Sequence, residues 1–174
     1  MPEDKDKIQF LIARQAAERE HSASILISHL IGTRDVLSRW GARQAVCYAG
    51  LFHSVYGTQS YRSLVELDQR KNIQHLIGEE AEGLAYLFCA MTRRAFIYNL
   101  DSKDKRYIHD RFTGKWTFIT QTDMQDICNI VVANWLEQVP RIPTLRNLNS
   151  APLEKMFPFL LSSAQEELSR TLTE

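Results

Sequence analysis

The sequence has few of the features that most readily assign a chain to a functional class. It has no surplus of charge, because Lys and Arg together number 21 and Asp and Glu together also number 21. It has no apolar run long enough for a signal peptide or a membrane span. A balanced chain creates no overall field that would attract nucleic acid or an anionic bilayer. We therefore expect neither partner, and we predict a cytoplasmic protein.

Cysteine is also scarce. Cys47, Cys89 and Cys128 are the only three in the chain, they stand in apolar surroundings, and they are not closely spaced. This pattern favours buried, reduced thiols over a disulfide framework or a zinc cluster. Two catalytic signatures are missing as well: there is no Gly-rich phosphate loop, and Ser54 does not lie between two glycines as a nucleophile elbow requires.

Apolar residues, in contrast, are plentiful at 44% of 174 residues. This content is sufficient for a proper core, and the length suits one domain. The sequence contains no internal repeat, low-complexity run or long linker. We therefore expect residues 1–174 to form a single domain.

Helical spacing of these apolar residues predicts an all-α bundle. Gly41 and Gly78 follow two of the segments and are well placed to end them. Glu79 and Glu80 precede a further helix, where acidic groups oppose the positive end of the helix dipole. The expected helices cover residues 8–16, 22–40, 45–52, 64–77, 81–91, 124–138 and 160–168.

Two of these helices make specific predictions about burial. The first should bury Ile8 and Ile12, with Phe10 off that face. The helix at residues 45–52 is apolar on nearly every side, so it should be central and fully surrounded. His53 then lies at its buried end.

Residues 107–119 are the one segment in which strands are expected. Their weak alternation around Gly114 predicts a short β-hairpin. Beyond it, Thr122 and Gln125 have the spacing of a capping box for the next helix. Prolines in residues 139–151 predict an irregular chain there.

Two histidines in apolar helical patterns form the most informative pair. His53 is followed directly by Ser54 at the end of one predicted helix, and His29 lies 24 positions upstream inside another. Two imidazoles could therefore meet between packed helices and define a polar site in an apolar interior.

The order of four segments resembles the HD superfamily of helical metal-dependent phosphohydrolases, particularly the hydrolase domain of bifunctional guanosine tetraphosphate synthetase/hydrolases. The run from His29 to Val36 resembles a His-Pro-x-x-Val-Ala-like segment that carries the first ligand. Residues 50–54, Gly-Leu-Phe-His-Ser, are similar to Leu-Leu-His-Asp. Residues 76–82 and 132–138 resemble Leu-Phe-Gly-Glu-Glu-Val-Ala and Leu-Ala-Asp-Arg-Leu-His-Asn. The resemblance covers residues 22–138 and implies an HD/phosphodiesterase-like bundle. An uncharacterised HD-like family with His-Ser in place of His-Asp is more similar still.

The departures from the family pattern bear on function. Of the four metal ligands that the resemblance implies, His29 and His53 match, whereas Ser54 and Asn134 stand at the two Asp positions. Each lost carboxylate removes roughly 4 kcal/mol of attraction for a cation at about 4 Å and an effective dielectric near 20. The hydrolase branch also has a Glu-Asp pair where this chain has Gly57-Thr58. We therefore do not expect inherited tetraphosphate hydrolysis.

The first functional hypothesis is a binding or regulatory module for a small polar or phosphorylated ligand in the former metal pocket. Arg34 and Arg62 would be available to bind a phosphate or a carboxylate group of the ligand. In the competing interpretation, the two histidines, Ser54 and Asn134 form a closed, uncharged hydrogen-bond network. The arginines are then ordinary surface charges. The expected ligand-binding residues are Ser54, Asn134, Thr58, Arg34 and Arg62, with Tyr56 and Tyr61 near the mouth.

The second hypothesis is an enzyme, a hydrolase or an oxygenase, with altered chemistry. The cofactor would be either none or a transition metal (Fe, Zn or Mn) on His29 and His53, with His21 as a weaker third ligand. His21 lies about 80° around the helix from His29. His53 or its metal would polarise a substrate, and Tyr56 or Glu80 would transfer a proton.

The third hypothesis is a structural or dimerising module. Four large aromatic residues, Trp116, Trp135, Phe157 and Phe159, could form a surface for a second copy of the chain. Aromatic side chains more often pack in the core, so each of them also has a purely structural interpretation.

Overall fold

The computed structural model describes residues 4–16, 20–101 and 106–173, with side chains except at residues 16, 20–25 and 146–150. This part of the chain is a bundle of α-helices with a single two-stranded sheet. The elements are α1 (Lys5–Ala16), α2 (Glu20–Arg39), α3 (Gln44–Leu51), the 3-10 turn η2 (Leu67–Gln69), α4 (Arg70–Ile77), α5 (Glu79–Ala90), α6 (Arg93–Asn99), β1 (Tyr107–Asp110), β2 (Lys115–Phe118), α7 (Gln121–Gln138), α8 (Leu145–Met156), the 3-10 turn η3 (Phe157–Phe159) and α9 (Ser162–Thr173).

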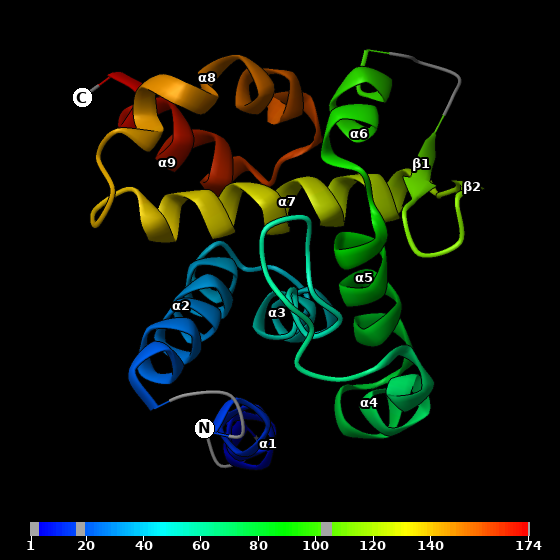
Figure 1. The fold of residues 1–174 in the computed structure, drawn as a ribbon. Coiled ribbons are helices and arrows are strands. Elements are labelled where there is room, and N and C mark those ends of the chain that lie inside the picture. Colours follow the sequence, from blue (N-terminus) through cyan, green and yellow to red (C-terminus); the bar gives the residue numbers. More distant parts are fainter. Residues whose placement is uncertain (1–3, 17–19, 102–105, 174) are drawn as a thin grey trace.

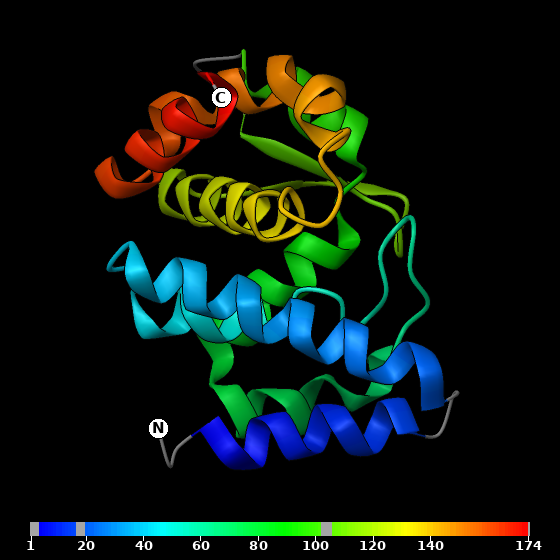
Figure 2. The same ribbon diagram turned by 90° about the vertical axis from the view of Figure 1, so that its left-hand side faces the viewer.

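The helices form layers on the two sides of α7. In Figure 1, α6, α8 and α9 lie above α7, and α2, α3 and α5 lie below it. Figure 2 shows the same layers from the side, with α1 and α4 farthest from α7. The helix α2 packs against both α3 and α7 and therefore joins the lower layers to the centre.

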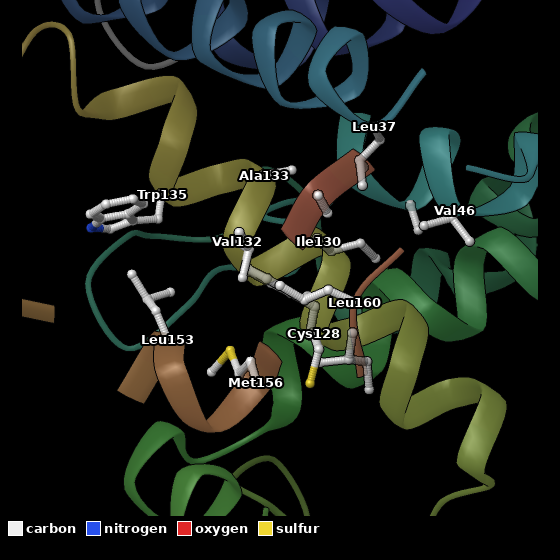
Figure 3. Close-up of a cluster of buried hydrophobic side chains, with 14 of the residues drawn as sticks. Leu37, Val46, Cys128, Ile130, Val132, Ala133, Trp135, Leu153, Met156 and Leu160 are labelled. Carbon is white, nitrogen blue, oxygen red and sulfur yellow. The ribbon is translucent and has the colours of Figure 1, made fainter. Parts of the chain in front are cut away.

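Two clusters of buried apolar side chains follow this layering. The larger surrounds α7, and Figure 3 shows Leu37 and Val46 on one side of it and Leu153, Met156 and Leu160 on the other. The smaller lies between α1, α3, α4 and α5. The buried stretch from Leu51 to Tyr56 belongs to this second cluster, except where polar side chains interrupt it.

Glycine and capping residues fix the helix ends. Gly41 has φ +75° directly after α2, and the Ala42 N–H donates to the Leu37 carbonyl at 3.1 Å, as at other helix C-termini of this kind. The capping box of α7 consists of Thr120 and Asp123, so the prediction of Thr122 and Gln125 for this role was wrong. The Asp123 carboxylate accepts the Thr120 N–H at 2.9 Å, and its charge also suits the helix N-terminus.

The predicted hairpin at residues 107–119 is confirmed. Strands β1 and β2 pair antiparallel, with Tyr107 opposite Phe118 and Asp110 opposite Lys115. Asp110 also organises the turn, since its carboxylate accepts the Phe112 N–H at 2.8 Å.

Three local predictions were wrong because tertiary packing decided the outcome. Ile12 is exposed, and Phe10 instead stacks on Phe52. The expected helix from residue 64 begins only at α4, because the N–H groups of residues 64 and 65 donate to the Val55 carbonyl. The stretch expected to be irregular up to residue 151 contains the first half of α8, which packs on α7 through Leu153.

Two further expectations concern the cysteines and membrane-spanning helices. Cys47, Cys89 and Cys128 are all buried free thiols, as predicted. Within the described ranges, no helix is both long and apolar enough to cross a membrane.

Candidate functional site

A pocket of about 210 Å³ lies where α2, α5, α6, α7 and the loop after α3 meet. Six residues singled out from the sequence line it together: His29, His53, Ser54, Thr58, Tyr61 and Asn134. The remaining lining residues in the described chain are Leu26, Gln59, Ser60, Phe88, Arg93 and Gln138. The structure therefore brings the two imidazoles to one cavity, and no acidic residue is among the described groups that line it.

The end of α3 places His53 and Ser54 at this cavity. The helix ends at Leu51, and tight turns follow in which the Val55 N–H donates to the Phe52 carbonyl at 2.9 Å. Leu51, Phe52 and Val55 are fully buried in the second apolar cluster, which anchors the turns on both sides of the polar pair. His53 and Ser54, each 3% exposed, are left on the pocket side.

His53 is a neutral imidazole with a defined tautomer. Its Nδ1–H donates to the Gly50 carbonyl at 2.6 Å, so Nε2 is the unprotonated ring nitrogen. Burial lowers the pKa of His53 to about 3, and the charges of His29 and Arg93 act in the same direction. Hydrogen bonding to Gly50 and Asn134 opposes this shift without reversing it. His53 therefore offers an acceptor at neutral pH.

His29 is held by a carboxylate that the sequence analysis did not assign to the site. Its Nδ1 contacts Glu137 of α7, which also accepts from Arg141 at 2.6 Å. This contact depends on Gly32, because a Cβ there would lie 2.6 Å from the Glu137 Cγ. Glu137 follows Asn134 by three residues on α7, so helical spacing could have indicated it. The rings of His29 and His53 meet edge to face, with centroids 5.1 Å apart.

Arg93 is the second residue that sequence reasoning missed, and it carries the only formal positive charge of a Lys or Arg among the described lining residues. Its guanidinium carbon lies 4.2 Å from the centroid of the Phe88 ring. Within the described part of the chain, no carboxylate pairs with it. Burial lowers its pKa from 12.5 to about 10, a shift that still leaves it charged at neutral pH. No sequence pattern marks it, because its distinguishing feature is the lack of a carboxylate partner among the residues that the structure describes.

Ser54 supplies a second polar group without a partner. Its Oγ is buried and has no hydrogen-bond partner among the residues that the structure describes. A buried hydroxyl without a partner is unfavourable by about 1 to 3 kcal/mol, and such groups are uncommon in native structures. Because Ser54 lines the pocket, an occupant of the pocket could satisfy it.

Four of the predicted site residues lie away from the pocket or outside its described lining. The Tyr56 hydroxyl donates to Glu82 at 2.9 Å inside the second apolar cluster. Arg34 pairs with Asp4, just before α1, and with Asp35 of α2, and Glu80 forms an exposed ion pair with Arg43. Arg62 is exposed and is not among the described lining residues. The side chain of His21 lies outside the described residues.

The buried carboxylate of Glu82 explains the orientation of Tyr56. Besides the tyrosine, it accepts from Arg70 at 2.6 and 2.9 Å and from Gln74 at 2.9 Å. Burial raises the pKa of Glu82, but these hydrogen bonds outweigh burial, so the net shift is downward. The network is satisfied internally, and it ties α4 and α5 to the turns after α3.

The pocket does not fit a resident divalent cation. Within the described ranges, no three His, Cys, Asp or Glu side chains are placed to share a metal. His29 and His53 would be joined only by neutral oxygen donors from Ser54 and Asn134, and Arg93 faces the same cavity. Hard divalent ions need anionic oxygen ligands, and a neighbouring guanidinium repels any cation.

The four aromatic residues considered for dimerisation divide into two groups. Trp135 is buried and Phe159 is half-buried, so both serve the core. Trp116 is 58% exposed on β2, and Phe157 is 36% exposed. Self-association through these last two side chains stays a prediction, which light scattering at high protein concentration would test.

Comparison with known proteins adds one finding. Residues 10–93 match the model of a family described as a domain of unknown function (DUF6817). The matched segment includes His29, His53, Ser54 and Arg93, whereas Asn134 lies beyond it. The chain is thus similar to this family over the part that supplies most of the pocket. No curated protein and no solved structure matches the chain.

Proposed function

We propose that this protein binds a small anionic organic molecule in the pocket between His29, His53 and Arg93, and that it acts as a binding or regulatory module. The observation that carries the proposal is the guanidinium of Arg93, which faces the pocket without a carboxylate partner in the described chain. A guanidinium in a pocket attracts an anion, and its planar fork of N–H donors matches a carboxylate or a phosphate. A bound anion would supply that missing partner.

The other groups in the pocket complement such a ligand. The Ser54 hydroxyl can donate to an anionic oxygen, and the Asn134 amide can donate or accept. The Nε2 of His53 accepts, so it would suit a hydroxyl or amide elsewhere on the ligand. Specificity would come from these few convergent polar groups in a small cavity.

The proposal keeps the converging imidazoles that the resemblance to HD phosphohydrolases implies, but it replaces the bound metal by an anion. An HD-like arrangement would explain why two imidazoles converge between α2 and α3. The charge of the pocket, however, favours an anion where that superfamily holds a metal. Elemental analysis of protein purified without chelators should therefore find no stoichiometric metal, and finding one would contradict the proposal.

The direct test is binding of small anions by the wild-type chain and by two variants. Inorganic phosphate, acetate and the neutral analogue acetamide would be titrated by NMR, which measures weak affinities. We expect at least one anion to shift the signals of pocket residues in wild type and in Arg94→Met, but not in Arg93→Met. Arg94 is the matched control, because it neighbours Arg93 on α6 and is exposed. Equal binding by Arg93→Met, or no binding by any chain, would refute the proposal.

A second candidate function is proton-transfer catalysis in the same pocket. The contact between Glu137 and the Nδ1 of His29 favours it, because a carboxylate in this position orients an imidazole so that Nε2 can act as a base. The test is a screen of ester and phosphoester substrates. Turnover that falls in His29→Ala and Glu137→Gln together would support an enzyme, and absence of turnover would leave the binding module.

A further inference from the structure

A second pocket adjoins the proposed anion site. It measures about 290 Å³ and shares three lining residues with the first: Arg93, Asn134 and Gln138. These three residues therefore form a polar wall that the two cavities share. A molecule bound to Arg93 would have access to both.

The second pocket differs from the first in chemistry. Apart from the shared wall, the described residues that line it are all apolar: Ile97, Val131, Trp135, Leu145, Pro152, Leu153 and Met156. Figure 3 shows Leu153 and Met156 of α8 facing the side of α7 that carries Val132 and Trp135. A cavity of about 150 Å³ lined by apolar side chains can hold benzene, so this one has room for a ring or a short alkyl chain.

The charge of the combined site limits the anionic group. Arg93 is the only Lys or Arg among the described residues that line either pocket. The buried His53 adds an uncharged acceptor rather than a second cation. One guanidinium matches a carboxylate in charge and in its two parallel hydrogen bonds, whereas a phosphomonoester would bring close to two negative charges.

We infer that the ligand is a monocarboxylic acid with an aryl or medium-length alkyl group, its carboxylate on Arg93 and its apolar part among Val131, Trp135 and Leu153. This inference rests on the proposed function, because it assumes that Arg93 holds an anion. It adds the chemical class of the ligand and a second site that the sequence did not indicate. The hydrophobic effect would supply most of the affinity, and the guanidinium would fix the orientation.

The test compares acetate, hexanoate, phenylpropanoate, hexanol and inorganic phosphate by NMR titration. Each buried methylene contributes about a four-fold gain in affinity, so hexanoate should bind at least ten-fold tighter than acetate even with partial burial. Hexanol, which has the tail without the charge, should bind more weakly than hexanoate. Phosphate should bind more weakly than either tailed acid.

Two variants separate the contributions of tail and charge. Val131→Phe fills the second pocket and should remove most of the difference in affinity between hexanoate and acetate. Ile142→Phe makes a similar change at an exposed residue outside both pockets and should have no effect. Arg93→Met should weaken every acid and spare hexanol.

The outcomes distinguish this inference from the function on which it rests. If acetate and hexanoate bind equally well, or if Val131→Phe leaves their ratio unchanged, the second pocket is not part of the site and only the anion-binding function stands. If phosphate binds tighter than the tailed acids, the carboxylate assignment is overturned. If no anion binds, both proposals fail.

Discussion

Replacing Arg93 by methionine is expected to stabilise the unliganded protein and to abolish anion binding. Methionine keeps an unbranched apolar stem, so the contact with Phe88 is partly retained while the charge is removed. If the guanidinium were needed for the fold, Arg93→Met would instead lower the free energy of unfolding. The variant therefore separates a functional role of the guanidinium from a structural one.

The magnitude follows from the depressed pKa. A base whose pKa is lower in the folded chain is less stable in its charged form there, and this penalty applies wherever both states are charged, including pH 7. The shift from 12.5 to about 10 corresponds to roughly 3.5 kcal/mol at about 1.4 kcal/mol per pKa unit. The cation–π contact with Phe88 offsets about 0.5 to 2 kcal/mol of it in the wild type. The expected net gain is about 1 to 3 kcal/mol in the free energy of unfolding.

The assay is urea denaturation of wild type, Arg93→Met and the matched control Arg94→Met, with the slope of each transition compared. The control should stay within about 0.5 kcal/mol of wild type, because surface substitutions usually do. Added ligand should stabilise wild type by mass action and should leave Arg93→Met unchanged. A loss of more than about 1 kcal/mol in Arg93→Met would show that the guanidinium supports the fold, and the reasoning would be wrong.

Three further predictions test other parts of the structure. The wild type should lose stability between pH 7 and pH 5, because only the unfolded His53 takes up a proton between pH 6.5 and about 3, and His53→Gln should reduce this loss by about 2 kcal/mol. Urea denaturation at both pH values measures the loss, with His75→Gln as the exposed control. Tyr56→Phe should lower stability by about 1 to 3 kcal/mol through the lost hydrogen bond to Glu82, with unchanged anion affinity; weaker binding would return the tyrosine to the site. Gly57→Ala should cost at least about 1 kcal/mol in thermal denaturation, because φ is +74° and the new Cβ would lie 2.8 Å from a backbone nitrogen; an unchanged melting temperature would contradict this.

The fold was predictable where local signals decide the conformation. Gly41, Gly78 and Gly114 all have positive φ, and each marks a helix end or a turn that the sequence indicated. The helix α8 was missed because Pro140 and Pro143 favour irregular chain, and the prediction extended it to residue 151, six residues beyond the start of the helix at Leu145. Its apolar side chains on α7 stabilise it instead, and that contact is not visible in local spacing.

The candidate site was predictable only in part, for a physical reason. His29 and His53 could be singled out because polar residues inside apolar helical patterns are recognisable in a sequence, whereas Ser54 and Asn134 were indicated by the resemblance to the HD superfamily. Tyr56 could not be placed, because it follows the end of α3 and its direction depends on tight turns and on the distant Glu82. The importance of Arg93 depends on which acids are not near it, and only a folded structure shows that.

The charge of the pocket bears on whether the site is a closed polar network or a binding site. If this site had only lost the carboxylates that the HD resemblance implies, selection for stability alone would favour apolar side chains that fill the cavity or an internal partner for every polar group. Glu82 shows that this chain can satisfy a buried charge completely. At the pocket, however, Arg93 is without a carboxylate and Ser54 without a hydrogen-bond partner in the described chain. Groups that reduce stability in this way are typical of functional sites, where a ligand completes the interactions. Among the described lining residues, the absence of acids and the presence of one guanidinium without a carboxylate partner therefore favour the proposed anion site.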